Sequence, residues 1–241
     1  MPRSGMYGLD MNPFNIKAHL AYSMHRLGVD YIDLYQPSRL DAAVPIEEVV
    51  GVLQECIKEG YIGSIGLTQV SPEDIEKATA LQPIKMLEVE YALTNRTIET
   101  DGVLEKAREH NISLLAFGVL SHGLLAAKPA AVGANEKVTG YRPQISPETK
   151  AAMLGVITDM AQEKHTSVEK LAQAYVHAKY PDMTILIGTT RKEHLQDSID
   201  ALSLTLSAED IQRLEAAFPA GKFQEVNLPD IFFRNGKMIR R

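Results

Sequence analysis

Residues 62–74 read IGSIGLTQVSPED, and this stretch decides the fold class of the chain. Its first part, up to Val70, is a short β-rich run that favours a buried strand. Ser71 then stands where a helix N-cap is expected, with Pro72 at the first helical position and Asp74 where a capping box needs its acid. A strand that leads this quickly into a capped helix is typical of a βα unit.

Four more β-rich runs are spaced along the chain, and helix-length amphipathic runs follow them. The runs are residues 30–37, 84–93, 113–120 and 183–190. After the first run, residues 45–60 carry apolar side chains at helical spacing, and Gly60 ends the expected helix. The apolar face of that helix consists of Val49, Val50, Leu53, Cys56 and Ile57. The alternation predicts parallel βαβ units and disfavours a β-sandwich or a helical bundle.

Further helices are expected over residues 71–81, near 101–110 and over 207–218. Between the fourth and fifth runs, a connection rich in Ala, Gly and Pro (126–147) precedes two more helices. The stretch 166–169 fits another capping box at the start of the second of these helices. A connection as long as 126–147 is more often functional than idle.

The chain of 241 residues, of which 45% are hydrophobic, is large enough to bury a sizeable core. No linker or composition shift divides it, so we expect a single domain over residues 1–241. Residues 219–241 are expected to form an irregular tail that carries Phe223, Phe232 and Phe233.

Charge and cysteine content narrow the class of protein. The net charge is -6 with acids and bases interspersed, which disfavours nucleic acid and membrane surfaces as partners. Cys56 is the only cysteine, no targeting segment or membrane span is recognisable, and the cytoplasm is the expected compartment. Seven histidines without a pair at ligand spacing predict no metal site. A small-molecule role is therefore the simplest expectation.

The number of strands alone favours an open, flavodoxin-like sheet of about five strands over a barrel of eight. Three stretches reverse this preference. Residues 28–71, 87–125 and 185–202 are together similar to the C-terminal part of an aldo-keto reductase, and the similarity runs from Asn15 to Phe218. The segments QPSRLD, EVEYAL and GVLSHGLL resemble the pyridoxal reductase-like branch of that family more than the aldose reductase branch.

The resemblance implies a (β/α)8 TIM barrel in which the five strands correspond to strands four to eight. Active sites of such barrels lie at the C-terminal ends of the strands. The resemblance also implies an NADP cofactor, with an aromatic ring, here Phe117 where Tyr is usual, stacked on the nicotinamide. The nicotinamide carboxamide would be held by Thr68, Gln69 and Glu88.

Two further groups of residues are implied to hold the rest of the cofactor. The pyrophosphate would be approached by the backbone of Gly118, Val119, Leu120, Gly123 and Leu124. The 2′-phosphate and the adenine would be held after the last strand by Gly188, Thr189, Thr190, Arg191, His194, Asp197 and Ser198. The helix that begins there adds its N-terminal amides to the anion site, and Arg191 with Lys192 favours NADP over NAD.

Each assignment has a structural alternative. Arg191 and Lys192 could form a solvated face at a helix start, Thr68 and Gln69 an ordinary turn, and Phe117 a core residue. Glu88 is the most unusual residue, because a carboxylate on a central strand is costly to bury unless it reaches a ligand or a partner. We therefore favour a functional role for Glu88.

The catalytic residues of the family have few counterparts in this chain. In the family, a Tyr protonates the substrate oxygen and is tuned by a Lys and an Asp, and all three come from the first three strands. Residues 5–13 resemble the loop that follows those strands. No position here corresponds to them, so this chain alone is expected to lack carbonyl reductase activity. It would be either a segment that starts at an internal Met of a longer reductase or a shortened product.

The family's catalytic His corresponds to Ser38, and Arg39 and Asp41 match the pyridoxal reductase-like branch. Arg39 could polarise a carbonyl or bind an acidic substrate group. Alternatively, it could form a structural ion pair with Asp41 or Asp30.

The reading that results is an NADP-dependent aldo-keto reductase that acts on pyridoxal or another small carbonyl compound. With five strands, both sheet edges would stay open, and self-association could cover them. A regulatory subunit that only binds nucleotide is the second hypothesis. An open α/β binding domain with strand order 2-1-3-4-5 is the third.

Overall fold

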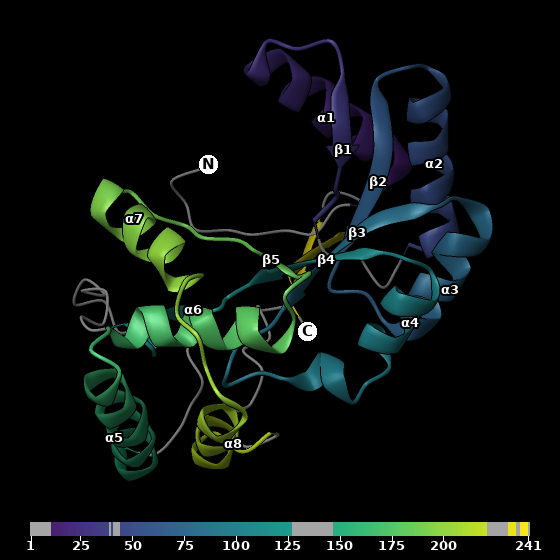
Figure 1. Cartoon of the computed structure of the whole chain (residues 1–241). Coiled ribbons are helices and arrows are strands. Elements are labelled where there is room, and N and C mark those ends of the chain that lie inside the picture. Colours follow the sequence, from purple (N-terminus) through teal and green to yellow (C-terminus); the bar gives the residue numbers. More distant parts are fainter. Residues whose placement is uncertain are drawn as a thin grey trace. The chain divides into compact units, whose positions relative to one another are not determined.

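The computed structural model describes residues 11–38, 40, 44–126, 147–220, 231–234 and 237–240. Five strands follow one another in a single sheet in the order β1-β2-β3-β4-β5 (Figure 1). They are β1 (Ile32–Tyr35), β2 (Ile62–Thr68), β3 (Ile84–Glu90), β4 (Ser113–Phe117) and β5 (Thr184–Ile185). The pairs β1–β2, β2–β3 and β4–β5 are parallel. The expected βα units are confirmed, and the strand order 2-1-3-4-5 of an open sheet is wrong.

Contacts within the chain divide it into two compact units. The first contains Met1–Glu88, Asp101–Ser113 and Pro229–Arg241, and the second contains Val89–Thr100 and Leu114–Leu228. The expectation of a single domain over residues 1–241 stays a prediction.

Four helices accompany the strands of the first unit. They are α1 (Pro13–Leu27), α2 (Ile46–Lys58), α3 (Pro72–Leu81) and α4 (Val103–Glu109). Helix α2 packs against α1, α3 and β2 (Figure 1). The apolar face expected for α2 is confirmed, because Val49, Val50 and Leu53 are fully buried and Cys56 is nearly so. Ile57 lies at the border of this face and is half-buried.

Local signals in the sequence set where the first-unit helices begin and end. The Ser71 hydroxyl accepts from the Asp74 amide at 3.1 Å, and the Asp74 carboxylate accepts from the Ser71 amide, so the predicted capping box is confirmed. Gly60 follows α2 with a φ of 81°, a left-handed conformation that favours glycine.

The described part of the second unit contains four helices and two short 3₁₀ turns. The helices are α5 (Pro147–Glu163), α6 (Val168–Lys179), α7 (Lys192–Ala201) and α8 (Ala208–Ala217), and the turns are η1 (Thr97–Glu99) and η2 (Ser121–Gly123). Helix α6 packs against α5, α7 and β5, and α5 packs against α8. The core of the second unit includes Ile157, Leu171, Tyr175, Leu214 and Phe218. Strand β5 is much shorter than the run 183–190 that predicts it.

The capping box expected over 166–169 is wrong. The N-cap of α6 is Ser167, whose hydroxyl accepts from the Lys170 amide at 3.2 Å. The residue three positions after this cap is Lys170, which carries no side-chain acceptor for a reciprocal bond. At α8, by contrast, Ser207 and Asp210 form a complete capping box.

The tail differs from the irregular segment expected over 219–241. Strands β6 (Ile231–Arg234) and β7 (Lys237–Arg240) form an antiparallel pair in which Arg234 lies opposite Lys237. The dipeptide Asn-Gly between two apolar runs is a strong hairpin signal that accounts for this pairing. Phe232 and Phe233 therefore belong to β6, whereas Phe223 and nearly all of the connection 126–147 lie outside the described residues.

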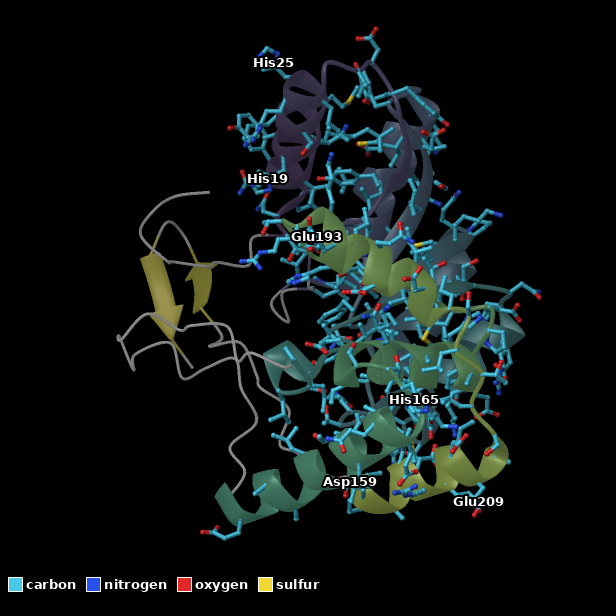
Figure 2. All side chains as sticks on the ribbon, turned by 60° about the vertical axis from the view of Figure 1, so that its left-hand side comes forward. His19, His25, Asp159, His165, Glu193 and Glu209 are labelled. Atoms are coloured by element: carbon cyan, nitrogen blue, oxygen red, sulfur yellow. The ribbon has the colours of Figure 1, made fainter. Side chains whose placement is uncertain are left out.

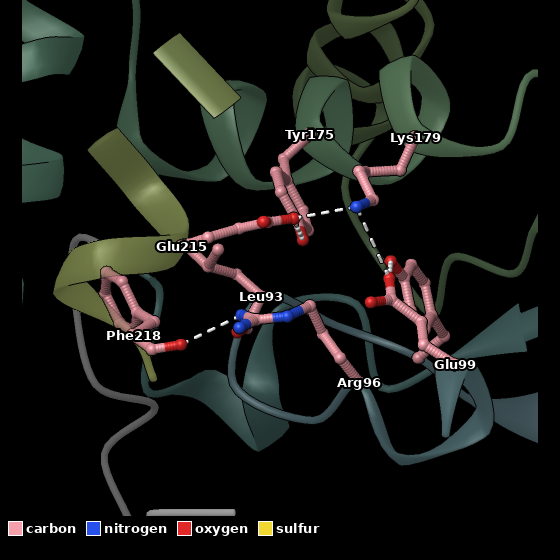
Figure 3. A network of polar contacts seen from close by, with 8 residues as sticks. Leu93, Arg96, Glu99, Tyr175, Lys179, Glu215 and Phe218 are labelled. Carbon is pink, nitrogen blue, oxygen red and sulfur yellow. Dashed lines mark hydrogen bonds and ion pairs between the residues drawn. The ribbon is translucent and has the colours of Figure 1, made fainter. Parts of the chain in front are cut away.

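A network of polar contacts lies inside the second unit (Figure 3). One nitrogen of Arg96, Nη1, donates to the carbonyl oxygens of Leu93 and Phe218, each at 2.8 Å. Lys179 lies between the carboxylates of Glu215 and Glu99, at 2.8 and 3.7 Å. Buried polar groups need such partners. No side-chain nitrogen or oxygen atom that is buried in the described part of the chain lacks a hydrogen bond.

No helix within the described ranges is both long enough and apolar enough to cross a membrane.

Candidate functional site

In the first unit, polar side chains meet where β1, β2 and β3 approach their carboxyl ends. Thr68 and Glu88 are paired across β2 and β3. The amide nitrogen of Gln36, directly after β1, donates to the Thr68 hydroxyl at 3.0 Å and also to Oε2 of Glu88. The Thr68 hydroxyl donates in turn to the carbonyl of Pro37 at 3.2 Å. The structure thus brings together two of the three residues expected to hold the carboxamide.

Gln69, the third of these residues, follows β2 in a left-handed conformation. Its φ is 51°, which is uncommon for a residue other than glycine. The Gln69 amide donates to the Glu88 carbonyl at 2.9 Å, so this backbone conformation is held by the neighbouring strand. Strained residues of this kind concentrate at functional sites.

The structure changes the argument for Glu88. Its side chain is half-buried, and Gln36 satisfies one of its oxygens. The cost of burial therefore no longer requires a ligand, which was the reason for expecting one. Sequence reasoning missed Gln36, although its place near the end of the β-rich run 30–37 puts it at the same sheet edge as the predicted residues.

The residues expected to act on the substrate are only partly described. Ser38 is exposed in the loop that follows β1. Arg39 and Asp41 lie outside the described residues, so neither the carbonyl-binding role of Arg39 nor its pairing with Asp41 or Asp30 is tested.

In the second unit, the loop after β4 makes a tight turn. Gly118 has a φ of 70°, and a Cβ atom there would lie 3.3 Å from Cγ of Glu90, so glycine suits this position. The Ser121 amide donates to the Gly118 carbonyl at 2.6 Å. The Ser121 hydroxyl is buried and lies 2.6 Å from that of Thr94, and this hydrogen bond stabilises the turn.

The remaining residues expected around this loop have mixed surroundings. Phe117 ends β4 and is half-buried, whereas Val119 is buried and contributes its side chain to the core. Leu120 and Leu124 are half-buried. Gly123 has a φ of 87° and nothing within 4 Å of a Cβ placed there. The backbone of Gly123 could therefore be approached closely.

The residues after β5 lead into the N-terminus of α7. The Thr189 hydroxyl accepts from the Arg191 amide at 3.2 Å, and Arg191 is the N-cap of α7 without a side-chain cap bond. The first amides of α7 are thus not capped by a side chain, as an anion site at a helix start requires. Exposed groups surround this helix start, namely Gly188, Thr190, Lys192 and His194.

Other residues of α7 are engaged within the protein. Asp197 forms an ion pair with Lys170 at 2.9 Å, and the Ser198 hydroxyl donates to the His194 carbonyl at 2.9 Å. Glu193 adds a carboxylate to the first turn (Figure 2), which opposes an anion there. The described contacts therefore leave Arg191 and Lys192 as the cations at this helix start.

One group of side chains in the first unit has the composition of a metal site. Glu76, Glu109 and His110 place ligand atoms within 4.8 Å of one another on an exposed surface. Lys106 already pairs with Glu76 at 2.6 Å and with Glu109 at 2.7 Å. These hydrogen bonds to Glu109 and Glu76 raise the pKa of Lys106 above its usual range. The expectation of no metal site stays a prediction.

Comparison with known proteins gives a consistent family. A family model described as the aldo/keto reductase family matches residues 2–218. A Glycine max protein named "Probable aldo-keto reductase 1" is 30% identical over 218 residues, which cover 88% of this chain and 62% of that protein. The chain therefore spans less than two thirds of the length of this relative.

Solved structures agree at the level of the fold. A glycerol dehydrogenase from Gluconobacter oxydans matches with a TM-score of 0.79 and 25% identity, over 89% of this chain and 67% of that chain. A thermostable aldo-keto reductase in complex with the inhibitor epalrestat matches with a TM-score of 0.67 and 23% identity, over 86% and 67%. Both support an α/β fold of the TIM-barrel type.

Proposed function

Because this chain belongs to the aldo/keto reductase family, we propose that it binds NADP and is part of an oxidoreductase for small carbonyl compounds. The observation that carries this proposal is the contact set at Thr68 and Glu88, which are paired in register and bridged by Gln36. A pyridoxal-like substrate, the pyridoxal reductase-like branch and a cytoplasmic location are parts of the same proposal.

The first-unit residues suit the carboxamide of a nicotinamide ring. A carboxylate only accepts hydrogen bonds, and the carboxamide amine only donates them. Glu88 would therefore hold the amine, and the strand ends would fix the plane of the ring.

The second-unit residues suit phosphate groups. The positive φ angles at Gly118 and Gly123 bring backbone to the surface, and the uncapped start of α7 offers amides to an anion. Arg191 would bind a 2′-phosphate through its planar guanidinium, which favours NADP over NAD.

When bound, the reduced cofactor supplies a hydride to the carbonyl carbon of the substrate. The residues of this chain would bind and orient the cofactor, and Ser38 and Arg39 would lie near the substrate. The family's Tyr, Lys and Asp have no counterpart in this sequence, and a phenol needs a neighbouring cation to act as an acid near neutral pH. We therefore expect cofactor binding without turnover.

Fluorescence titration of the chain with NADPH and NADH tests the proposal. We expect NADPH to bind more tightly than NADH, and Arg191→Ala to weaken NADPH about tenfold while it leaves NADH nearly unchanged. Lys58→Ala, at the end of α2, is a matched control that removes a cation elsewhere.

Three possible results would decide between the hypotheses. Binding of neither nucleotide contradicts the proposal. Tight binding without oxidation of NADPH by pyridoxal agrees with a nucleotide-binding regulatory role for this chain, whereas rapid oxidation contradicts the expected lack of turnover.

Apolar surface in each unit favours self-association. Phe14 and Leu27 of α1 are 78% and 67% exposed, and Leu195 and Ile199 of α7 are 49% and 53% exposed. Large exposed apolar groups are typical of interaction surfaces when they lie on one helix face, as Leu195 and Ile199 do at a spacing of four residues on α7. We include association with a second copy in the proposal.

A further inference from the structure

We propose that Gln36 is a positioning residue that presents the Glu88 carboxylate to the carboxamide amine and makes the site selective for a ring that carries an amine donor. The inference rests on the proposed binding of a nicotinamide cofactor. It adds a residue and a selectivity that the family resemblance does not supply.

Gln36 contacts both Thr68 and Glu88 through the hydrogen-bond donors of its side-chain amide. A side-chain amide carries two N–H groups. The Gln36 nitrogen contacts the Thr68 hydroxyl at 3.0 Å and Oε2 of Glu88, so both donors are used within the protein. Glu88 is thereby held in one orientation before any ligand arrives, and a group held in place loses less entropy on binding.

The side chain of Gln36 occupies space next to Gly66 on β2. The pairing of β2 with β3 shifts between Ile65 and Gly66, and such irregularities redirect neighbouring side chains. A Cβ atom at Gly66 would lie 2.5 Å from Oε1 of Gln36 and 3.2 Å from its Cδ and Cγ atoms. Gln36 can therefore lie across β2 only because position 66 has no side chain.

The single hydroxyl hydrogen of Thr68 is also used within the protein. Its hydroxyl accepts from Gln36 and donates to the Pro37 carbonyl at 3.2 Å. Neither Thr68 nor Gln36 has a donor left for a ligand, so these three side chains offer acceptor atoms alone. A ring substituent without an N–H donor would leave Oε1 of Glu88, the oxygen to which Gln36 does not donate, without a hydrogen bond from the ligand, which is costly once water is excluded.

The experiment compares two nucleotides that differ at this one group. NADPH carries the carboxamide, and its 3-acetylpyridine analogue carries a methyl ketone that cannot donate. The ratio of their dissociation constants is measured for the full chain by fluorescence titration. We expect the wild type to prefer NADPH by about tenfold to a hundredfold, the usual range for a hydrogen bond to a charged group.

Two variants remove the positioning in different ways. Gln36→Met keeps the size of the side chain without its donors, and Gly66→Ala keeps Gln36 but displaces its amide. Both are expected to lower the ratio toward one. Gln54→Met and Gly51→Ala are matched controls on α2, because the Gln54 amide donates to the Leu81 carbonyl and Gly51 has open space around it.

The outcomes separate this inference from the proposed function. A wild type that binds NADPH, together with variants that keep the wild-type ratio, overturns the role of Gln36 and leaves the proposed function intact. A wild type that binds neither NADPH nor 2′-phospho-ADP-ribose, which lacks the nicotinamide, overturns both. A variant that is merely less stable weakens both nucleotides equally, and an unchanged ratio then also counts against the inference.

Discussion

Lys179 holds the carboxylate of Glu215, and the pKa of Glu215 depends on this contact. The ammonium lies 2.8 Å from Oε1 of Glu215, and the Tyr175 hydroxyl donates to the same oxygen at 2.8 Å. Burial alone raises the pKa of Glu215, but the hydrogen bonds from Lys179 and Tyr175 outweigh it and hold this pKa below its ordinary value. Burial also raises the pKa of Tyr175 well above its usual range, so its hydroxyl stays a donor.

The lowered pKa predicts how stability changes with pH. A carboxyl group whose pKa is lower in the folded state stabilises the fold above its unfolded value of about 4.3, and this stabilisation is lost as pH falls through the folded pKa. Glu215→Gln should therefore reduce the loss of unfolding free energy between pH 6 and pH 3 by up to about 1 kcal/mol, because water partly screens this ion pair. Urea unfolding at several pH values measures this.

Glu73→Gln provides the control for this pH effect. Hydrogen bonding to Lys77 lowers the pKa of Glu73, but its side chain is 76% exposed and water screens the pair. We expect this variant to follow the wild-type pH profile. A Glu215 variant that also follows it would contradict the contribution of the Lys179 contact.

Some contacts between individual residues could be predicted from the sequence, and others could not. Thr68 and Glu88 could be placed together through the family resemblance, which assigns both residues to the carboxamide, and the structure pairs them across β2 and β3. Gln36 could not be predicted as their bridge, since its reach depends on the missing side chain at Gly66 and on the register shift beside it. The ion pair of Asp197 with Lys170 joins two successive helices, α7 and α6, and no pattern within either helix reveals it.

The start of α6 depends on one hydroxyl group. Ser167 accepts from the Lys170 amide, whereas the neighbouring Thr166 hydroxyl makes no hydrogen bond with the described residues. Loss of an N-cap costs about 1 kcal/mol because a helix amide is left without an acceptor. We therefore expect Ser167→Ala to lower the free energy of unfolding by about 1 kcal/mol.

Thr166→Ala is the matched control for the cap of α6. It should change stability by much less than Ser167→Ala in the same urea titration. A larger loss of stability for Thr166→Ala than for Ser167→Ala would instead support the capping box that the spacing over 166–169 suggests.

The elements differ in how clearly the sequence marks them. The helices with Ser-Pro or Ser-Ala starts, α3 and α8, were predictable because their caps are local. The extent of β5 was not, since the apolar run 183–190 leaves the sheet after Ile185 and only tertiary pairing decides where it ends. The hairpin of β6 and β7 could also have been predicted, because the dipeptide Asn-Gly between the two strands is a local signal.

The chain as a whole exposes apolar surface on helices of both units. On α1, Ile16 and Leu20 are buried, while Phe14 and Tyr22 are 78% and 59% exposed on other parts of its surface. Leu195 and Ile199 of α7 and its C-cap residue Leu202 are spaced as one helical stripe, and all three are exposed. A helix with this much exposed apolar surface normally packs against something.

This surface predicts association that depends on concentration. Burial of each such side chain contributes about 1.5–3 kcal/mol, so a few of them can hold two copies together at micromolar concentration. Sedimentation velocity at increasing concentrations should show species larger than the 26.6 kDa monomer. Phe14→Asp combined with Leu195→Asp should shift the chain toward the monomer, because a carboxylate cannot be buried there without a partner. Glu47→Gln and Glu48→Gln, on exposed positions of α2, control for a change of charge elsewhere. A wild type that stays monomeric at the highest concentration would show that these apolar residues do not bind a second copy.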